Sequence, residues 1–228
     1  MEVTLFYPNI KQLFITIFYC SVIITGCSDI LHSTNNHKHY GHYNNHNFNA
    51  IEEYISRIGK RLLIVSNDVK LANVHIIFDF NTSDTPSLTI NYDQKFNHTS
   101  HNIITISKGL LDSLQDEAEL ATVLAISLES LYSNDFASTN DSAAHTADNR
   151  ILNHLYKAGY DPMAFVELQN EYLTDQDPAH SWLRPLFSPI NINKQRVAIN
   201  KKTVLTMPGG LQRGKQRYLS SMNLLKKY

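Results

Sequence analysis

The chain has 228 residues, with 20 Lys and Arg against 21 Asp and Glu, and its formal charge is therefore −1. This balance gives no electrostatic reason to expect nucleic-acid binding, and an apolar content of 43% excludes a wholly disordered chain. Two cysteines exclude a disulfide-stapled miniprotein and a four-cysteine zinc site, whereas 11 histidines are an unusually large number.

The first 26 residues have the features of a secretory signal peptide. Residues 13–25 form an uncharged run that would span about 20 Å as a helix, short of the roughly 30 Å core of a bilayer. The run ends in Ile24-Thr25-Gly26-Cys27, which resembles a bacterial lipobox. The resemblance implies that Cys27 becomes the acylated (palmitate-bearing) N-terminus. Since Ser28 follows it rather than Asp, it also implies a periplasm-facing anchor in the outer membrane. The alternative is an ordinary signal peptide or membrane anchor with an incidental cysteine.

Residues 27–49 are rich in Asn and His and lack helical or strand periodicity, so they are expected to form a flexible tether. Imidazoles at this density can bind zinc or copper, and they gain charge as the pH falls towards 6. The alternative is a hydrophilic spacer that holds a domain away from a membrane. The histidines concerned are His32, His37, His39, His42 and His46.

A single domain of mixed α+β class, mostly helical with a small sheet, is expected over residues 50–228. Apolar residues at helical spacing predict a helix over 50–63, and β-branched and aromatic residues predict strands at 74–80, 88–90 and 103–106. The polar residues 93–102 are expected to form a loop. Three helices are then predicted, at 113–131, 145–158 and 163–172, and Gly159 fits the position just past a helix end.

Beyond residue 175 the chain is interrupted by prolines and ends in a basic tail, residues 194–228, that contains no Asp or Glu. The cations of this tail are suited to phosphate head groups, lipopolysaccharide or an acidic protein face. The other interpretation is a solvated amphipathic helix over residues 216–227 that closes the fold.

Three segments, in this order, resemble zinc metallopeptidases of the HtpX/Oma/BepA type. Residues 104–111 (ITISKGLL) are similar to that family's strand followed by Gly-Leu-Leu, and residues 116–125 (DEAELATVLA) are similar to its active-site helix. Ala147-Asp148 followed by residues 157–162 (KAGYDP) is similar to its next helix and turn. The resemblance covers roughly residues 51–173 and implies a zincin-like fold.

The family's catalytic positions carry different residues in this chain. In the family, two His of an HExxH helix and a Glu of the next helix bind zinc, and the Glu inside the motif is the general base. The resemblance places the His positions at Ile126 and Ser130, the base at Ser127 and the third ligand at Ala144. Aliphatic side chains cannot bind zinc, and hydroxyls are poor ligands beside imidazole and carboxylate. We therefore expect no zinc cofactor and no hydrolysis.

An atypical ligand set is the alternative, and it would make the chain an active zinc metalloendopeptidase. Glu129, His145, His98 and His101 are the candidates, although helix geometry turns Glu129 and His145 away from the mapped positions. Solvated histidines and a spare carboxylate are the simpler interpretation.

Asp148 matches a family acid that orients a metal-binding His. Since that His is absent here, Asp148 is expected to cap a helix or to pair with a base such as Arg150. Ser188-Pro189 with Arg196 resembles a later family element that contributes a His and an Arg near the site. The lipobox, the family resemblance and the replaced catalytic positions together lead to one hypothesis. The chain would be a catalytically inactive metallopeptidase-like lipoprotein that binds a peptide or protein partner in the cell envelope, with a role in outer-membrane protein assembly or quality control.

Overall fold

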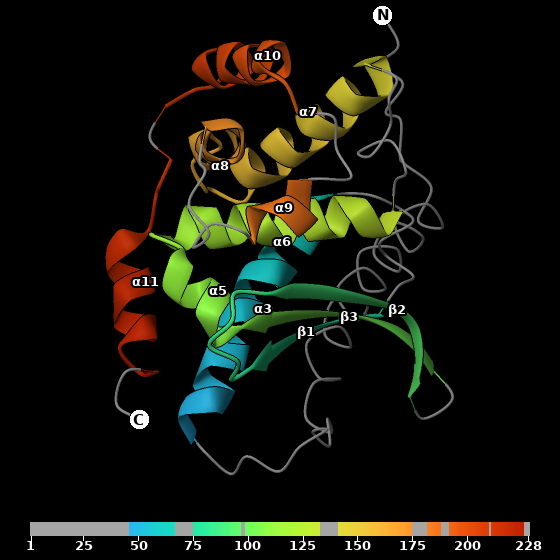
Figure 1. Cartoon of the computed structure of the whole chain (residues 1–228), viewed down its shortest axis with the longest axis vertical. Coiled ribbons are helices and arrows are strands. Elements are labelled where there is room, and N and C mark those ends of the chain that lie inside the picture. Colours follow the sequence, from blue (N-terminus) through green and yellow to red (C-terminus); the bar gives the residue numbers. More distant parts are fainter. Residues whose placement is uncertain are drawn as a thin grey trace, which may run out of the picture. The chain divides into compact units, whose positions relative to one another are not determined.

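The computed structural model describes residues 46–66, 75–96, 99–132, 141–174, 182–187, 192–209 and 211–225. These residues form a mixed α+β domain that is mostly helical with one small sheet, which confirms the expected class (Figure 1). The signal peptide, Cys27, almost all of the tether and Ser188-Pro189 lie outside the described residues. No helix in the described part of the chain is both long and apolar enough to cross a membrane.

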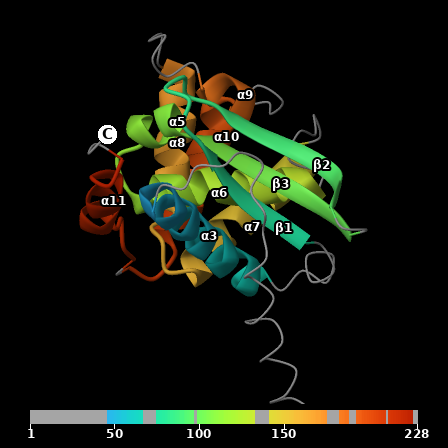
Figure 2. The same ribbon diagram turned by 90° about the horizontal axis from the view of Figure 1, so that it is seen from below.

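Helix α3 (His46–Ser66) opens the domain and begins four residues before the predicted start at residue 50. Its apolar residues Ile51, Ile55, Ile58 and Leu62 are spaced three or four positions apart and are buried, so that one face of the helix packs on the core. Figure 2 shows α3 running beside strand β1 (His75–Asn81).

The sheet has the strand order β1-β3-β2, with β3 (Thr99–Ser107) in the centre. Strand β1 pairs with β3 in parallel, and β2 (Leu88–Phe96) pairs with β3 in antiparallel orientation, with an irregularity between Asn91 and Gln94. The prediction of a loop over residues 93–102 was wrong for most of that segment. The two strands continue through its polar residues, because ladder hydrogen bonds join backbone groups whatever the side chains.

The chain turns from β3 directly into helix α5 (Lys108–Ser113) and then into helix α6 (Glu117–Tyr132). The predicted helix over 113–131 begins later than expected, because Leu114 ends α5 and the side chain of Asp116 accepts a hydrogen bond from the Glu119 N–H at the start of α6. Helix α6 is the central element: it is buried along nearly its whole length. It lies between the layer of α3 and the sheet and the layer of α7 and α8 (Figure 1).

The remaining helices cover the other side of α6. Helix α7 (Asp141–Lys157) ends before Gly159, whose φ of 80° is the left-handed conformation expected of a glycine past a helix end. Helix α8 (Met163–Thr174) and the short α9 (Leu183–Phe187) follow. Helix α10 (Lys194–Leu205) packs on α8 and α7, and helix α11 (Lys215–Met222) returns to α3 and α6. Helix α10 was not predicted, and α11 was predicted as a longer helix over residues 216–227.

Candidate functional site

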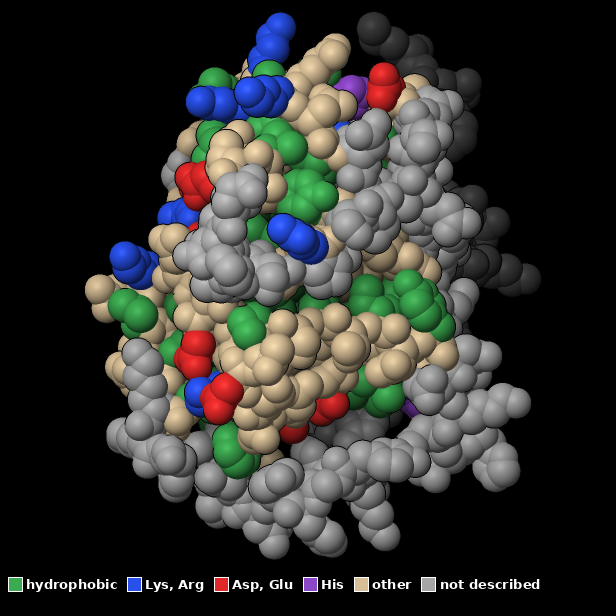
Figure 3. All heavy atoms as spheres, in the orientation of Figure 1, with side chains coloured by type: hydrophobic (Ala, Val, Ile, Leu, Met, Phe, Trp, Pro, Cys, Tyr) green, Lys and Arg blue, Asp and Glu red, His purple; other side chains and the backbone are tan. Residues whose placement is uncertain are grey.

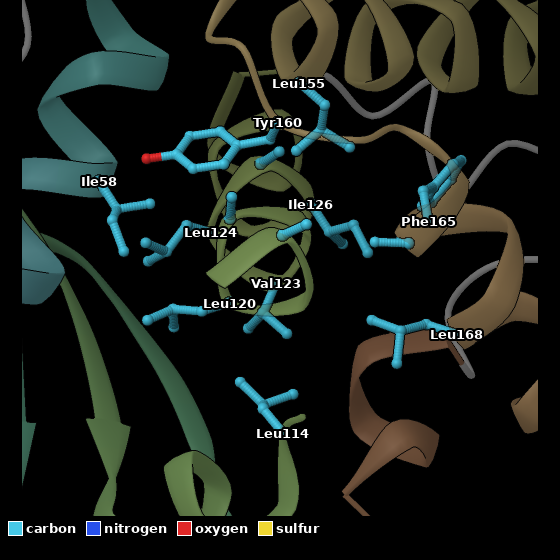
Figure 4. Packing of buried hydrophobic residues seen from close by; sticks show 14 of the residues in the cluster. Ile58, Leu114, Leu120, Val123, Leu124, Ile126, Leu155, Tyr160, Phe165 and Leu168 are labelled. Atoms are coloured by element: carbon cyan, nitrogen blue, oxygen red, sulfur yellow. The ribbon is translucent and has the colours of Figure 1, made fainter. Parts of the chain in front are cut away.

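Helix α6 carries three of the four positions at which the family would have catalytic groups. Ile126 is buried and points towards Phe165 of α8, within the apolar core (Figure 4). Ser127 is completely buried, and its hydroxyl donates a 2.8 Å hydrogen bond to the Val123 carbonyl. The Ser130 hydroxyl likewise donates to the Ile126 carbonyl, at 2.9 Å. Both hydroxyls are therefore bonded to the preceding turn of their own helix.

The fourth position, Ala144, lies on α7 and is also buried. Its carbonyl accepts a hydrogen bond of 3.4 Å from Nη2 of Arg196. In the described part of the chain, no three His, Cys, Asp or Glu side chains come together in a way that could hold a metal ion.

The candidates for an atypical ligand set are found on different elements. Glu129, at the end of α6, accepts three hydrogen bonds of 2.5–3.2 Å from the Arg150 guanidinium on α7. His145 lies on α7, whereas His101 lies on β3 opposite His75 of β1, with the two rings 5.3 Å apart and at 60° to each other. His98 is outside the described residues. Glu129 is thus in an ion pair with Arg150, and His101 is in an aromatic pair with His75.

Asp148 is held in a buried polar cluster between α7, α8 and α10. Its two carboxylate oxygens accept hydrogen bonds of 2.7 Å from Nε and Nη2 of Arg196. The Asn200 amide donates to the same carboxylate, at 2.7 Å, and to the Gln169 side-chain oxygen, at 3.0 Å. The expected pairing of Asp148 with a base is confirmed, but the base is Arg196 and not the suggested Arg150, whose guanidinium reaches Glu129. Asp148 and Arg196, the two residual family positions, are brought together.

A second buried polar cluster, which the sequence analysis missed, lies at the start of α6. The Glu117 carboxylate accepts two hydrogen bonds, of 3.0 and 3.1 Å, from Arg217 of α11 and one from the Tyr54 hydroxyl. Arg213 is 2.7 Å from Asp116 and 3.4 Å from Glu119. The sequence contained an indication of this cluster. Three acids stand at the start of a predicted helix, and two arginines stand four residues apart in the basic tail.

Burial changes the pKa of two members of this cluster, Glu119 and Tyr54. Desolvation raises the pKa of Glu119 to about 7, although the hydrogen bond from the Gln115 N–H opposes the shift. Desolvation and the nearby Glu117 carboxylate raise the pKa of the Tyr54 phenol, so this hydroxyl stays protonated and donates. The arginines of the tail thus fasten the end of the chain onto the first turn of α6.

Strand β2 offers a different kind of site, because it has a paired strand on one side only among the described residues. Ser107 donates its N–H to the Ser87 carbonyl, which marks this opposed pair as a hydrogen-bonded pair of the antiparallel ladder. Hydrogen-bonded and non-hydrogen-bonded pairs alternate along such a ladder. The N–H and C=O groups of Leu88 and Ile90 therefore point away from β3, towards the outer edge of the sheet.

The side chains of this strand divide between its two faces. Leu88 and Ile90 are half-buried, and Leu88 packs against the hydrophobic core, whereas Thr89 and Asn91 are exposed. Helix α6 contacts β2, so the outer strand lies next to the helix that carries the mapped positions. An extended chain laid along β2 could pair with the outward groups of Leu88 and Ile90.

One surface hollow in the described part of the chain has a volume of about 270 Å³ and lies where α10 leads into the following turn. It shares no residue with the mapped positions or with β2. Its lining is polar and apolar in about equal parts and consists of Asp161, Pro162, Val204, Leu205, Met207, Pro208, Gly209 and Leu211.

Comparison of the chain with known protein families finds no family that matches. A search among curated proteins likewise finds none with significant similarity to the chain.

Proposed function

We propose that this protein is a catalytically inactive, metallopeptidase-like lipoprotein that binds an extended segment of a protein partner along the outer edge of β2. Lipid on Cys27 would hold it at the periplasmic face of the bacterial outer membrane, where an unfolded or partly folded envelope protein is the natural partner. The proposed role is in the assembly or quality control of outer-membrane proteins.

The outward-facing backbone of Leu88 and Ile90 is the observation that carries this proposal. An edge strand binds a peptide through main-chain hydrogen bonds, which supply affinity without requiring a particular sequence. This mode suits a partner that is recognised because it is extended. The exposed Thr89 and Asn91, which alternate with these positions, are polar, which limits self-association through this part of the strand.

The side chains at the mapped positions support the loss of hydrolysis. Ile126 is part of the apolar core, and the hydroxyls of Ser127 and Ser130 donate to the backbone of their own helix. A peptidase would need a metal-bound water and a base next to the scissile bond. Binding without cleavage is the activity that these residues favour.

The proposal is tested by comparing Ile90→Pro with Ile90→Ala. Both variants remove the half-buried side chain, but only proline removes the outward N–H, and proline is tolerated at an edge where that N–H is not in the ladder. Full-length protein is titrated into fluorescent extended peptides tiled from outer-membrane β-strand sequences, and anisotropy is recorded.

We expect wild type and Ile90→Ala to bind these peptides, and Ile90→Pro to bind about tenfold more weakly, the effect of one lost hydrogen bond plus the proline ring. Thermal melting checks that both variants are folded. Equal binding by the two variants would overturn the edge site, and cleavage of the peptides that is abolished by a chelator would favour the peptidase alternative.

A further inference from the structure

The structure sorts the cations of the basic tail into two groups. Arg196, Arg213 and Arg217 all pair with carboxylates of the domain itself. The three lysines of α10, which are Lys194, Lys201 and Lys202, are exposed, and no carboxylate among the described residues pairs with them. Among the described residues of the tail, Lys215 of α11 is likewise exposed, but three exposed lysines occur together only on α10.

The exposed face of α10 combines this charge with hydrophobic side chains. Leu205 is 70% exposed and Ile199 is 39% exposed. Leu205 lies four residues after Lys201, and Ile199 lies three residues before Lys202, so each of these two lysines has an exposed aliphatic neighbour about one helical turn away. Figure 3 shows Lys and hydrophobic side chains gathered together over α10.

We propose that this face of α10, defined by Lys194, Ile199, Lys201, Lys202 and Leu205, docks on an anionic lipid surface. Helices that lie in a membrane interface carry Lys on a polar side and aliphatic residues beside it, so that the charges meet phosphate groups while the aliphatic side chains enter the acyl boundary. Each lysine near an anionic leaflet strengthens binding by about fivefold.

An anionic bilayer fits this face better than an acidic protein patch does. Lysines on flexible stems can follow mobile head groups and keep their ammonium groups in water while the stems lie along apolar surface. Leu205 and Ile199 each lie within one helical turn of a lysine, so an aliphatic side chain can enter the acyl boundary while the neighbouring ammonium group stays at the level of the head groups. The inference concerns a second contact with the membrane and does not depend on the lipid at Cys27 or on peptide binding at β2.

The chain provides a matched control on α3. Lys60 and the 77% exposed Ile64 have the same four-residue spacing as Lys201 and Leu205. Unlike α10, α3 also carries an exposed acid, Glu53. Figure 1 shows α10 at the top of the domain, beyond α7 and α8, whereas α3 runs from the bottom of the view up to α6. The variants Lys201→Gln/Leu205→Gln and Lys60→Gln/Ile64→Gln thus lose the same charge and a comparable exposed side chain.

Full-length wild type and both variants are sedimented with phosphatidylcholine vesicles that contain either no phosphatidylglycerol or about a third of it, at low and high salt. For each protein, the affinity for anionic vesicles is divided by the affinity for neutral vesicles. This ratio removes any contribution of the apolar segment 13–25, which all three proteins share. We expect wild type and the α3 variant to prefer the anionic vesicles at low salt, and the α10 variant to lose this preference by about fivefold or more.

Three results would overturn the proposal. The first is the absence of any preference for anionic vesicles in wild type, and the second is an equal loss in the α3 and α10 variants, which would indicate only a response to total charge. The third is a wild-type protein that ignores the vesicles but binds polyglutamate through α10, which would assign this face to an acidic protein.

Discussion

Asp148 and Arg196 are 48 residues apart in the sequence and are joined by two hydrogen bonds of 2.7 Å. The Asp148 side chain is fully buried, and Arg196 is nearly so. Because a charge in such surroundings requires its partner, this pair fixes α10 against α7. The face of α10 that carries the exposed lysines is thereby held on the outside of the domain.

Replacing Arg196 with Met should therefore destabilise the protein strongly. The substitution leaves the Asp148 carboxylate buried without its guanidinium, a change that costs about 3–5 kcal/mol in comparable sites. The free energy of unfolding is measured in urea. The double variant Arg196→Met/Asp148→Leu removes both charges and should be less destabilised than Arg196→Met alone. A single variant that loses less than about 1 kcal/mol would show that the pair does not hold α10.

The raised pKa of Glu119 predicts how stability depends on pH. In the folded protein this carboxyl keeps its proton up to about pH 7, whereas in the unfolded chain it ionises near its ordinary value of 4.5. The folded state therefore binds more protons between these values, and its stability falls as the pH rises through this window. The loss is at most roughly 3 kcal/mol if the full shift is expressed.

The variant Glu119→Gln cannot ionise but keeps an oxygen that can accept the Gln115 N–H. Its free energy of unfolding, measured in urea, should lose less between pH 5 and pH 8 than that of wild type does. The difference between the two proteins isolates Glu119 from the other titrating groups. Identical pH dependence in both proteins would mean that Glu119 titrates normally.

Gly214 comes immediately before α11, and its backbone has a positive φ of 69°. A Cβ added there would lie 2.7 Å from the Glu117 Cβ, and left-handed backbone costs other residues about 1–2 kcal/mol. Gly214→Ala should thus lower the free energy of unfolding by at least this amount. Gly209→Ala is the control, because no atom lies within 4 Å of its added Cβ, and it should change stability by less than about 0.5 kcal/mol. Equal losses in the two variants would contradict the described contact between α11 and α6.

Ile126 should behave as a core residue and not as the wall of an open active site. Ile126→Ala is expected to cost about 2–5 kcal/mol, whereas Ile64→Ala, at an exposed position on α3, should cost less than about 0.5 kcal/mol. Ser127→Ala should leave peptide binding unchanged, since this hydroxyl is bonded within its helix. Similar costs for the two isoleucine variants would place Ile126 at a surface.

The sequence predicted the elements whose buried face is apolar. Helix α3 and the body of α6 followed from the spacing of Leu, Ile and Ala, and the mixed α+β class followed from their order. Helix α10 was not predicted because its buried face includes Arg196 and Asn200 together with Val197 and Val204. No apolar periodicity arises when half of the buried positions are polar, and their partners come from helices far away in the sequence.

The polar strands and the ion pairs were harder to predict for a related reason. The outer parts of β2 and β3 are held by backbone pairing, which the side chains of residues 94–101 do not reveal. The pairing of Arg217 with Glu117 links positions 100 residues apart, and nothing local indicates which acid an arginine will meet. The four mapped positions of the metallopeptidase resemblance could be named in advance, but only the structure shows how their side chains are packed.

The zinc content of the purified full-length protein tests the central claim most directly. The tether histidines His32, His37, His39 and His42 are replaced by Asn so that they cannot contribute metal, and zinc is measured by atomic absorption after dialysis against a weak chelator. We predict much less than one zinc per chain, together with binding of extended peptides that remain uncut. About one tightly held zinc per chain would contradict the account, because a complete ligand set would then exist in this protein.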